Sequence, residues 1–175
     1  MNYNNYPSIG IDHKIKIIQN VLAASLGFNG VDFYGRTLRG LDKDGNSLSP
    51  EVMISSTESK EVYYDDAKAI GGNVFFIDAE DHSSSNGILF KAKIKIVFML
   101  NLNKIQSAPI TDAEAHYICV KQIQNTRSVT ITGLEKGLNN VLNDFNTERI
   151  RLLDSRPFHV FAITADLNYT FNCNN

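Results

Sequence analysis

The sequence has 175 residues, of which 43% are hydrophobic, and a formal net charge of −2. This length accommodates one domain with a substantial core, and the weakly acidic charge argues against a dedicated nucleic-acid-binding protein, whose domain is usually strongly basic. Two widely separated cysteines, Cys119 and Cys173, have neither zinc-ligand nor disulfide-framework spacing.

The N-terminus lacks the pattern of a secretory signal, and no apolar run approaches the ~20 residues that span a bilayer. We therefore expect an intracellular protein without membrane contact. Residues 1–10 are rich in asparagine and tyrosine and predict a flexible arm. An amphipathic helix follows, with Asp12 as its N-cap and Gly27 just beyond its C-terminus. Its apolar stripe consists of Ile11, Ile15, Ile18, Leu22 and Leu26.

Residues 28–50 have no regular pattern, and a short strand is expected over residues 51–56. The acidic turn at residues 42–46 superficially resembles a calcium-binding loop. An EF-hand requires glycine at the sixth position and glutamate at the twelfth, and these positions hold Ser47 and Met53. The segment is therefore interpreted as an ordinary surface turn.

Residues 57–88 are predicted to project from the body as an extended loop or hairpin. Two short strands are expected, over residues 61–66 and 73–78, followed by a polar loop over residues 78–87. Loops of that length are usually functional or mobile. The aromatic residues of this segment are candidate contacts with a neighbouring subunit, namely Tyr63, Tyr64, Phe75 and Phe76.

Two long strands are predicted from a period of two in the apolar side chains, over residues 90–103 and 158–173. Their length indicates that they are central and paired. One common apolar face is expected to be buried. Its members are Phe90, Ala92, Ile94, Ile96, Phe98, Leu100 and Leu102 on the first strand and Phe161, Ile163, Ala165, Leu167, Tyr169, Phe171 and Cys173 on the second.

Three lysines, Lys91, Lys93 and Lys95, form a row on the polar face of the first long strand. They are candidate subunit-interface residues that would pair with acidic groups of a neighbouring copy. Two other interpretations stay open, namely a solubilising face that protects strand edges and contact with a phosphate backbone. The arginines are dispersed without an aromatic platform, so direct nucleic-acid recognition is not expected.

Two helices are predicted between the long strands. Thr111 and Glu114 form a capping box for a helix that runs to about Asn125, with Tyr117, Val120 and either Cys119 or Ile123 facing the sheet. Residues 129–131 predict a short strand. Thr132 and Glu135 then repeat the capping-box spacing. The stripe of the second helix consists of Leu134, Leu138, Val141, Leu142 and Phe145.

This order of elements predicts a single α+β domain over residues 1–175. An antiparallel or mixed β-sheet would be covered on one face by about three helices. A doubly wound fold is not expected, because βαβ repeats with glycine-rich phosphate turns are missing.

The sequence contains no recognisable catalytic motif. His13, His82, His116 and His159 are scattered and no two have metal-ligand spacing, so no catalytic residue, metal or cofactor is predicted. The acidic loop at residues 78–82 leaves one alternative open, a small metal- or ligand-dependent α+β enzyme. A solvated loop is the simpler interpretation.

Several short segments, taken in order, resemble the tail terminators and related head-to-tail neck ring proteins of tailed bacteriophages. In that family an amphipathic helix precedes an aromatic-Gly-Arg segment, and proline introduces a short apolar strand. A charged alternating strand then precedes an acidic-capped helix, and an Ala-Asp-Leu-polar-Tyr strand closes the chain. The matching segments here are residues 33–36, 50–56, 91–102, 111–125 and 165–169. Extra residues at 57–88 and 126–147 make this chain longer than a compact terminator.

The resemblance implies a homo-oligomeric ring of six or twelve copies around the channel through which double-stranded DNA passes without sequence-specific binding. Other neck, tail or portal-proximal virion proteins would be its partners, and it would be assembled in the host cytoplasm into the virion. The family has no enzymatic activity and needs no cofactor. A bacterial adhesion or secretion-tube component is a third hypothesis, which the missing secretory signal disfavours.

Overall fold

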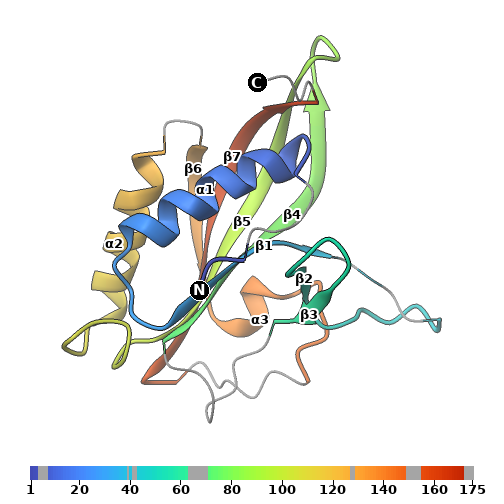
Figure 1. Cartoon of the computed structure of the whole chain (residues 1–175). Helices are drawn as coiled ribbons and strands as arrows, with labels where there is room; N and C mark the ends of the chain where they lie inside the picture. The colour runs from blue at the N-terminus through green and yellow to red at the C-terminus, as the bar shows by residue number, and fades with distance from the viewer. Residues whose placement is uncertain are drawn as a thin grey trace.

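A computed structural model describes residues 1–3, 8–38, 40, 43–62, 71–126, 129–148 and 155–171, with the backbone alone for residues 79–81. The predicted α+β class is confirmed: a mixed sheet has the strand order β3-β2-β1-β4-β5-β7-β6, with helices packed on it (Figure 1). The elements in chain order are α1 (Ile11–Ser25), β1 (Val31–Leu38), β2 (Glu51–Met53), β3 (Ser59–Glu61), β4 (Gly72–Ser84), β5 (Leu89–Asn101), α2 (Asp112–Gln124), β6 (Val129–Lys136), α3 (Leu138–Val141) and β7 (Phe158–Thr170).

The two predicted long strands, β5 and β7, are paired at the centre of the fold. Their antiparallel register is continuous from Leu89 opposite Thr170 to Asn101 opposite Phe158. The predicted common face is buried under α1 and α2 from Ala92 to Leu102 and from Phe161 to Tyr169. Phe98 and Phe161 stack across the pair with their ring centroids 4.8 Å apart. The period of two therefore predicted both strands and most of the face that they bury. Phe171 lies beyond the end of β7 with its side chain 57% exposed, and Cys173 lies outside the described residues.

Helix α1 lies across this face, and its predicted apolar stripe is buried. The N-cap is Gly10 rather than the predicted Asp12. Asp12 instead lies in the first turn, where its carboxylate accepts hydrogen bonds from Arg36 on β1. Gly27 follows the helix with φ +64°, the left-handed conformation predicted for this position.

Helix α2 begins with the predicted capping box. The Thr111 hydroxyl accepts a hydrogen bond from the Glu114 amide, and the Glu114 carboxylate accepts one from the Thr111 amide. Cys119 and Ile123 face the sheet, as predicted, and burial raises the pKa of the Cys119 thiol. The prediction for Tyr117 was wrong, because its side chain is 66% exposed.

The prediction of a long helix over residues 134–145 was wrong. Thr132 and Glu135 lie in β6, which pairs with the edge of β7. β-Branched residues at 129–132 favour a strand, and that pairing outweighs the local capping-box signal. Gly137, with φ +87°, then separates β6 from the four-residue helix α3. Because α3 packs on the opposite face of the sheet from α1 and α2, the expectation of three helices on one face was also wrong.

Residues 57–88 do not form a single projecting arm. β3 pairs with β2, and β4 is a central strand between β1 and β5. Part of the predicted strand over residues 61–66, and the loop up to residue 70, lie outside the described residues. β4 is apolar on both sides at Val74–Ile77 because both faces of the sheet are covered there. Such a continuous apolar run indicates two-sided burial.

The start of the chain is docked on the sheet in the part that the structure describes, which corrects the prediction of a flexible arm for residues 1–3. Asn2 forms a parallel bridge with Phe33 on β1, and the Tyr3 amide donates to the Phe33 carbonyl at 2.8 Å. The buried Gln19 of α1 donates to both carbonyls, those of Tyr3 and Phe33. The ring of Tyr3 stacks on that of Tyr34 at 4.8 Å.

Within the described part of the chain, the second face of the sheet is covered at one end. α3 and the chain after it pack there with residues from β1, β4, β5 and β7. The members of this second cluster are Tyr34, Val52, Val62, Phe75, Ile77, Val97, Met99, Val141, Leu142, Phe145, Val160 and Ala162.

No helix among the described residues has the length and apolar character to cross a bilayer.

We predict that Gly72→Ala strongly destabilises the fold. Gly72 has φ +146°, and a Cβ atom there would lie 2.0 Å from the Met99 carbonyl oxygen of the paired strand. The clash and the backbone strain together should cost at least about 2 kcal/mol of unfolding free energy, measured by urea denaturation. Gly45→Ala is the matched control, because its φ is +83° but its Cβ would meet nothing within 4 Å. Equal losses in the two variants would contradict the role assigned to the β4–β5 contact.

Candidate functional site

The predicted lysine row lies on the face of the sheet opposite α1 and α2. Lys91 and Lys93 are exposed and Lys95 is half-buried, on the part of β5 that α3 does not cover. Neighbouring positions of β7 and β6 on the same face are polar, including Asp166 and Glu135. We call this uncovered area of β5, β7 and β6 the charged sheet face.

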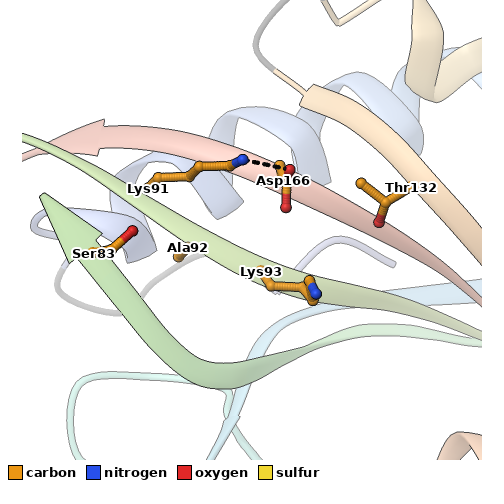
Figure 2. Close-up of a pocket in the computed structure, with 6 residues that line it drawn as sticks. All are labelled: Ser83, Lys91, Ala92, Lys93, Thr132 and Asp166. Carbon is orange, nitrogen blue, oxygen red and sulfur yellow. Dashed lines mark ion pairs between the residues drawn. The ribbon is translucent and has the colours of Figure 1, made fainter.

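Two of the three lysines are paired within the chain. The Lys91 ammonium lies 2.8 Å from Asp166, and that of Lys95 lies 2.9 Å from Glu135. Lys93 has no ion-pair partner among the described residues. A shallow hollow crosses the face and is lined by Ser83, Lys91, Ala92, Lys93, Thr132 and Asp166 (Figure 2). The acidic partners expected from a neighbouring copy are therefore supplied in this chain for Lys91 and Lys95.

Of the four aromatic residues predicted to contact a neighbouring subunit, two lie outside the described residues and two are buried within this chain. Tyr63 and Tyr64 lie outside the described residues. Phe75 and Phe76 are fully buried on opposite faces of β4, Phe76 towards α1 and α2 and Phe75 towards α3. Their side chains belong to the core of this chain and are not available to a neighbouring subunit. Their aromatic character predicted burial, but not whether the partner would be the same chain or another.

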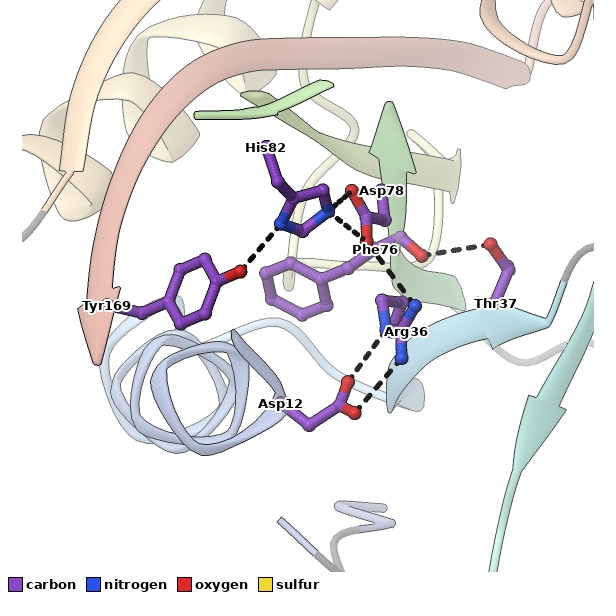
Figure 3. Close-up of polar contacts among 7 residues, drawn as sticks. All are labelled: Asp12, Arg36, Thr37, Phe76, Asp78, His82 and Tyr169. Atoms are coloured by element: carbon purple, nitrogen blue, oxygen red, sulfur yellow. Dashed lines mark hydrogen bonds and ion pairs between the residues drawn. The ribbon is translucent and has the colours of Figure 1, made fainter. Parts of the chain in front are cut away.

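A network of charged and polar side chains joins four elements at the other side of the sheet (Figure 3). Arg36 on β1 donates to both carboxylate oxygens of Asp12 on α1, at 2.8 and 3.1 Å. It also donates to Asp78 on β4 at 3.3 Å. His82 lies 2.9 Å from the same Asp78 carboxylate, and its other ring nitrogen lies 2.8 Å from the Tyr169 hydroxyl on β7.

A β-bulge in β4 makes this network possible. Asp78 is opposite Ile94 and His82 is opposite Ala92, so four steps along β4 match two steps along β5. Because Asp78 accepts from Nε2–H, Nδ1 of a neutral His82 accepts from the Tyr169 hydroxyl. Burial, and then the charge of Asp78, raise the pKa of Tyr169, whose hydroxyl is protonated at neutral pH even at its ordinary pKa.

The alternative enzyme site at residues 78–82 gains no support from this arrangement. The Asp78 side chain is 7% exposed and is held between the Arg36 cation and His82. A carboxylate so engaged is a poor ligand for an added divalent ion. The side chains of Glu80 and Asp81 lie outside the described part of the structure. The network instead ties α1 to β1, β4 and β7.

The expectation that the histidines are scattered was wrong for one pair. His116 on α2 and His159 on β7 face each other with their Nε2 atoms 2.8 Å apart, and Asp112 lies beside them. Burial, followed by the charges of His159 and Lys136, lowers the pKa of His116 to about 4. Two signals could have found this group. Asp112 and His116 are four residues apart on a helix, which places them on the same side of it. His159 is two positions before Phe161 on a strand, so its side chain points to the same, buried face of β7.

Comparison with known protein families and with curated proteins finds no match for this chain. The resemblance to phage neck proteins thus stays a prediction from the sequence.

We predict that Arg36→Met lowers the unfolding free energy by about 2 kcal/mol, because it leaves the buried Asp78 carboxylate without its guanidinium partner. This figure is below the full cost of breaking a buried pair, since Arg36 is 32% exposed. Chemical denaturation at neutral pH measures the change.

Lys91→Met is the matched control, because the Lys91 side chain is 57% exposed in its pair with Asp166. It should change the unfolding free energy by less than about 0.5 kcal/mol. Similar small effects in both variants would show that the network does not hold the elements together.

Proposed function

We propose that this protein is a structural subunit of a homo-oligomeric ring in the neck or tail of a tailed bacteriophage, either a tail terminator or a head-to-tail connector, without enzymatic activity. The sequence resemblance motivates the proposal. One structural observation carries it further: the hairpin formed by β4 and β5 ends in exposed apolar side chains, next to the charged sheet face.

The hairpin tip extends with the end of β7 beyond the helices, at the top of the view in Figure 1. Ile88 is 61% exposed, Leu89 is 49% exposed and Phe171 is 57% exposed. Leu89 pairs with Thr170, and the rings of Phe90 and Phe171 are in contact, so the exposed side chains lie at the same end of the sheet, with Leu89 on the charged sheet face and Phe171 on the face that carries α1. Single exposed apolar residues are common, but a cluster at a projecting tip is typical of a surface that another protein covers.

A second copy of this chain is the partner that the charges favour. The charged sheet face carries both signs, with Lys91 and Lys95 balanced by Asp166 and Glu135. A surface of balanced charge can approach an identical molecule without strong repulsion. In a ring each subunit presents two different surfaces to its two neighbours, and the projecting tip supplies one of them.

The same balance of charge suits a channel that conducts DNA. Each lysine that neutralises a phosphate adds steeply to DNA affinity. Among the described residues of the lysine row, only Lys93 lacks an acidic partner. Any part of this face that the neighbouring copy leaves uncovered would therefore let double-stranded DNA pass without being held, as a neck or tail ring requires.

We predict that the purified protein forms a closed ring of six or twelve copies, measured by native mass spectrometry over a concentration series. The double variant Ile88→Asp/Leu89→Asp should shift the population towards monomer, because charged groups at the tip cannot be buried against a neighbour. Tyr117→Ser, which alters an exposed aromatic residue on α2, is the control and should keep the ring.

Circular dichroism should show that both variants stay folded, since all three substituted side chains are exposed. A wild-type protein that stays monomeric at every concentration and is absent from phage particles would refute the proposal. A ring that the tip variant leaves intact would refute the role of the hairpin but not the ring itself.

A further inference from the structure

Asp112, His116 and His159 converge at the junction of α2 and β7. Asp112 and His116 lie on the same side of α2, one turn apart, and His159 is the second residue of β7. One ligand atom from each of the three side chains lies within 4.8 Å of the others. We propose that these three residues bind a divalent transition-metal ion of the Zn²⁺ class, which links the first turn of α2 to the start of β7.

The two imidazoles have the arrangement that a shared metal ion requires. Their Nε2 atoms point at each other across 2.8 Å. Two nitrogen ligands with bonds of about 2.0–2.1 Å to a tetrahedral ion lie roughly 3.3 Å apart, so a small rotation of the rings admits the ion. Both rings pack against Phe161, which keeps them close together while leaving their exposed edges free to turn by a small angle. Without a metal, only one proton can lie between the two nitrogens.

Asp112 supplies the third ligand without strain on the fold. Its side chain is 54% exposed and occupies the first position of α2, so its carboxylate can rotate towards the histidines. Lys136 is its ion-pair partner at 3.9 Å, and that ammonium is 55% exposed and free to move into solvent. The remaining coordination position faces solvent on the Asp112 side and accepts water.

The ligand set selects the class of ion. Two imidazoles and one carboxylate suit Zn²⁺, Co²⁺, Ni²⁺ and Fe²⁺, whereas Mg²⁺ and Ca²⁺ prefer oxygen ligands. The site is distinct from the acidic turn at residues 42–46 and from the Asp78 network. It uses none of the residues that carry the ring proposal.

The test uses the full chain after treatment with a chelator. Zn²⁺ should bind with a stoichiometry of one by isothermal titration calorimetry and raise the melting temperature, whereas Mg²⁺ at the same concentration should do neither. At a free Zn²⁺ concentration 100 times Kd, the ratio of folded to unfolded protein should increase about 100-fold. Co²⁺ should give the visible absorption bands of a low-symmetry, nitrogen-ligated site.

His116→Gln and His159→Asn should each weaken binding by more than the roughly 10–100-fold loss that follows removal of a second-shell partner. Lys136→Met should strengthen it about fivefold, because it removes a positive charge beside the ion. His13→Ala, which removes an exposed histidine from α1, is the control and should bind as the wild type does.

Three outcomes would overturn the proposal: no stoichiometric Zn²⁺ binding by the wild type, binding that survives in the His116→Gln/His159→Asn double variant, or equal responses to Zn²⁺ and Mg²⁺. Far-ultraviolet circular dichroism confirms that each variant is folded. The Co²⁺ spectrum of the wild type tests the ligand set even where a variant does not fold.

Discussion

β5 and β7 pair along their whole length, and this pairing sets where the helices and the other strands can lie. Thirteen residue pairs are in continuous register, and every second side chain faces α1 and α2. The opposite face changes character along its length. From Val97 to Leu100 the strand is buried on both faces, whereas at Lys91 and Lys93 the second face is open to solvent. α3 therefore packs at one end of the sheet, and the charged face and the hairpin tip remain exposed at the other.

The helices are held on this sheet by two different kinds of contact. Apolar burial supplies most of the stabilisation, through the stripe of α1 and the buried side of α2. Arg36 adds directional bonds, since it connects α1 with β1 and β4 through Asp12 and Asp78. At the other helix, the group of Asp112, His116 and His159 lies where α2 meets β7. Polar side chains are thus present at both junctions, where α1 meets β1 and β4 and where α2 meets β7, in addition to the apolar contacts.

The sequence predicted those elements whose own side-chain periodicity is clear. α1, α2, β5 and β7 follow from periods of 3.6 and two. The first half of β4 was predicted as a short strand over residues 73–78, but its central place in the sheet was not, because its apolar part is buried on both faces. Its polar half was predicted as a loop and instead continues as a strand beyond a bulge. Thr132 and Glu135 carry a helix signal that pairing with β7 overrides. His116 and His159 are 43 positions apart, and only the fold brings them together. Burial of Phe75 and Phe76 within the chain likewise depended on tertiary partners.

We propose that the exposed end of this sheet is completed by another copy of the chain. Electron cryomicroscopy of phage particles that contain the protein tests it most directly. We expect a closed ring of identical subunits in the neck or tail, with Ile88, Leu89 and Phe171 buried against the adjacent subunit. Particles without the protein, or a ring in which these three side chains face solvent, would contradict it.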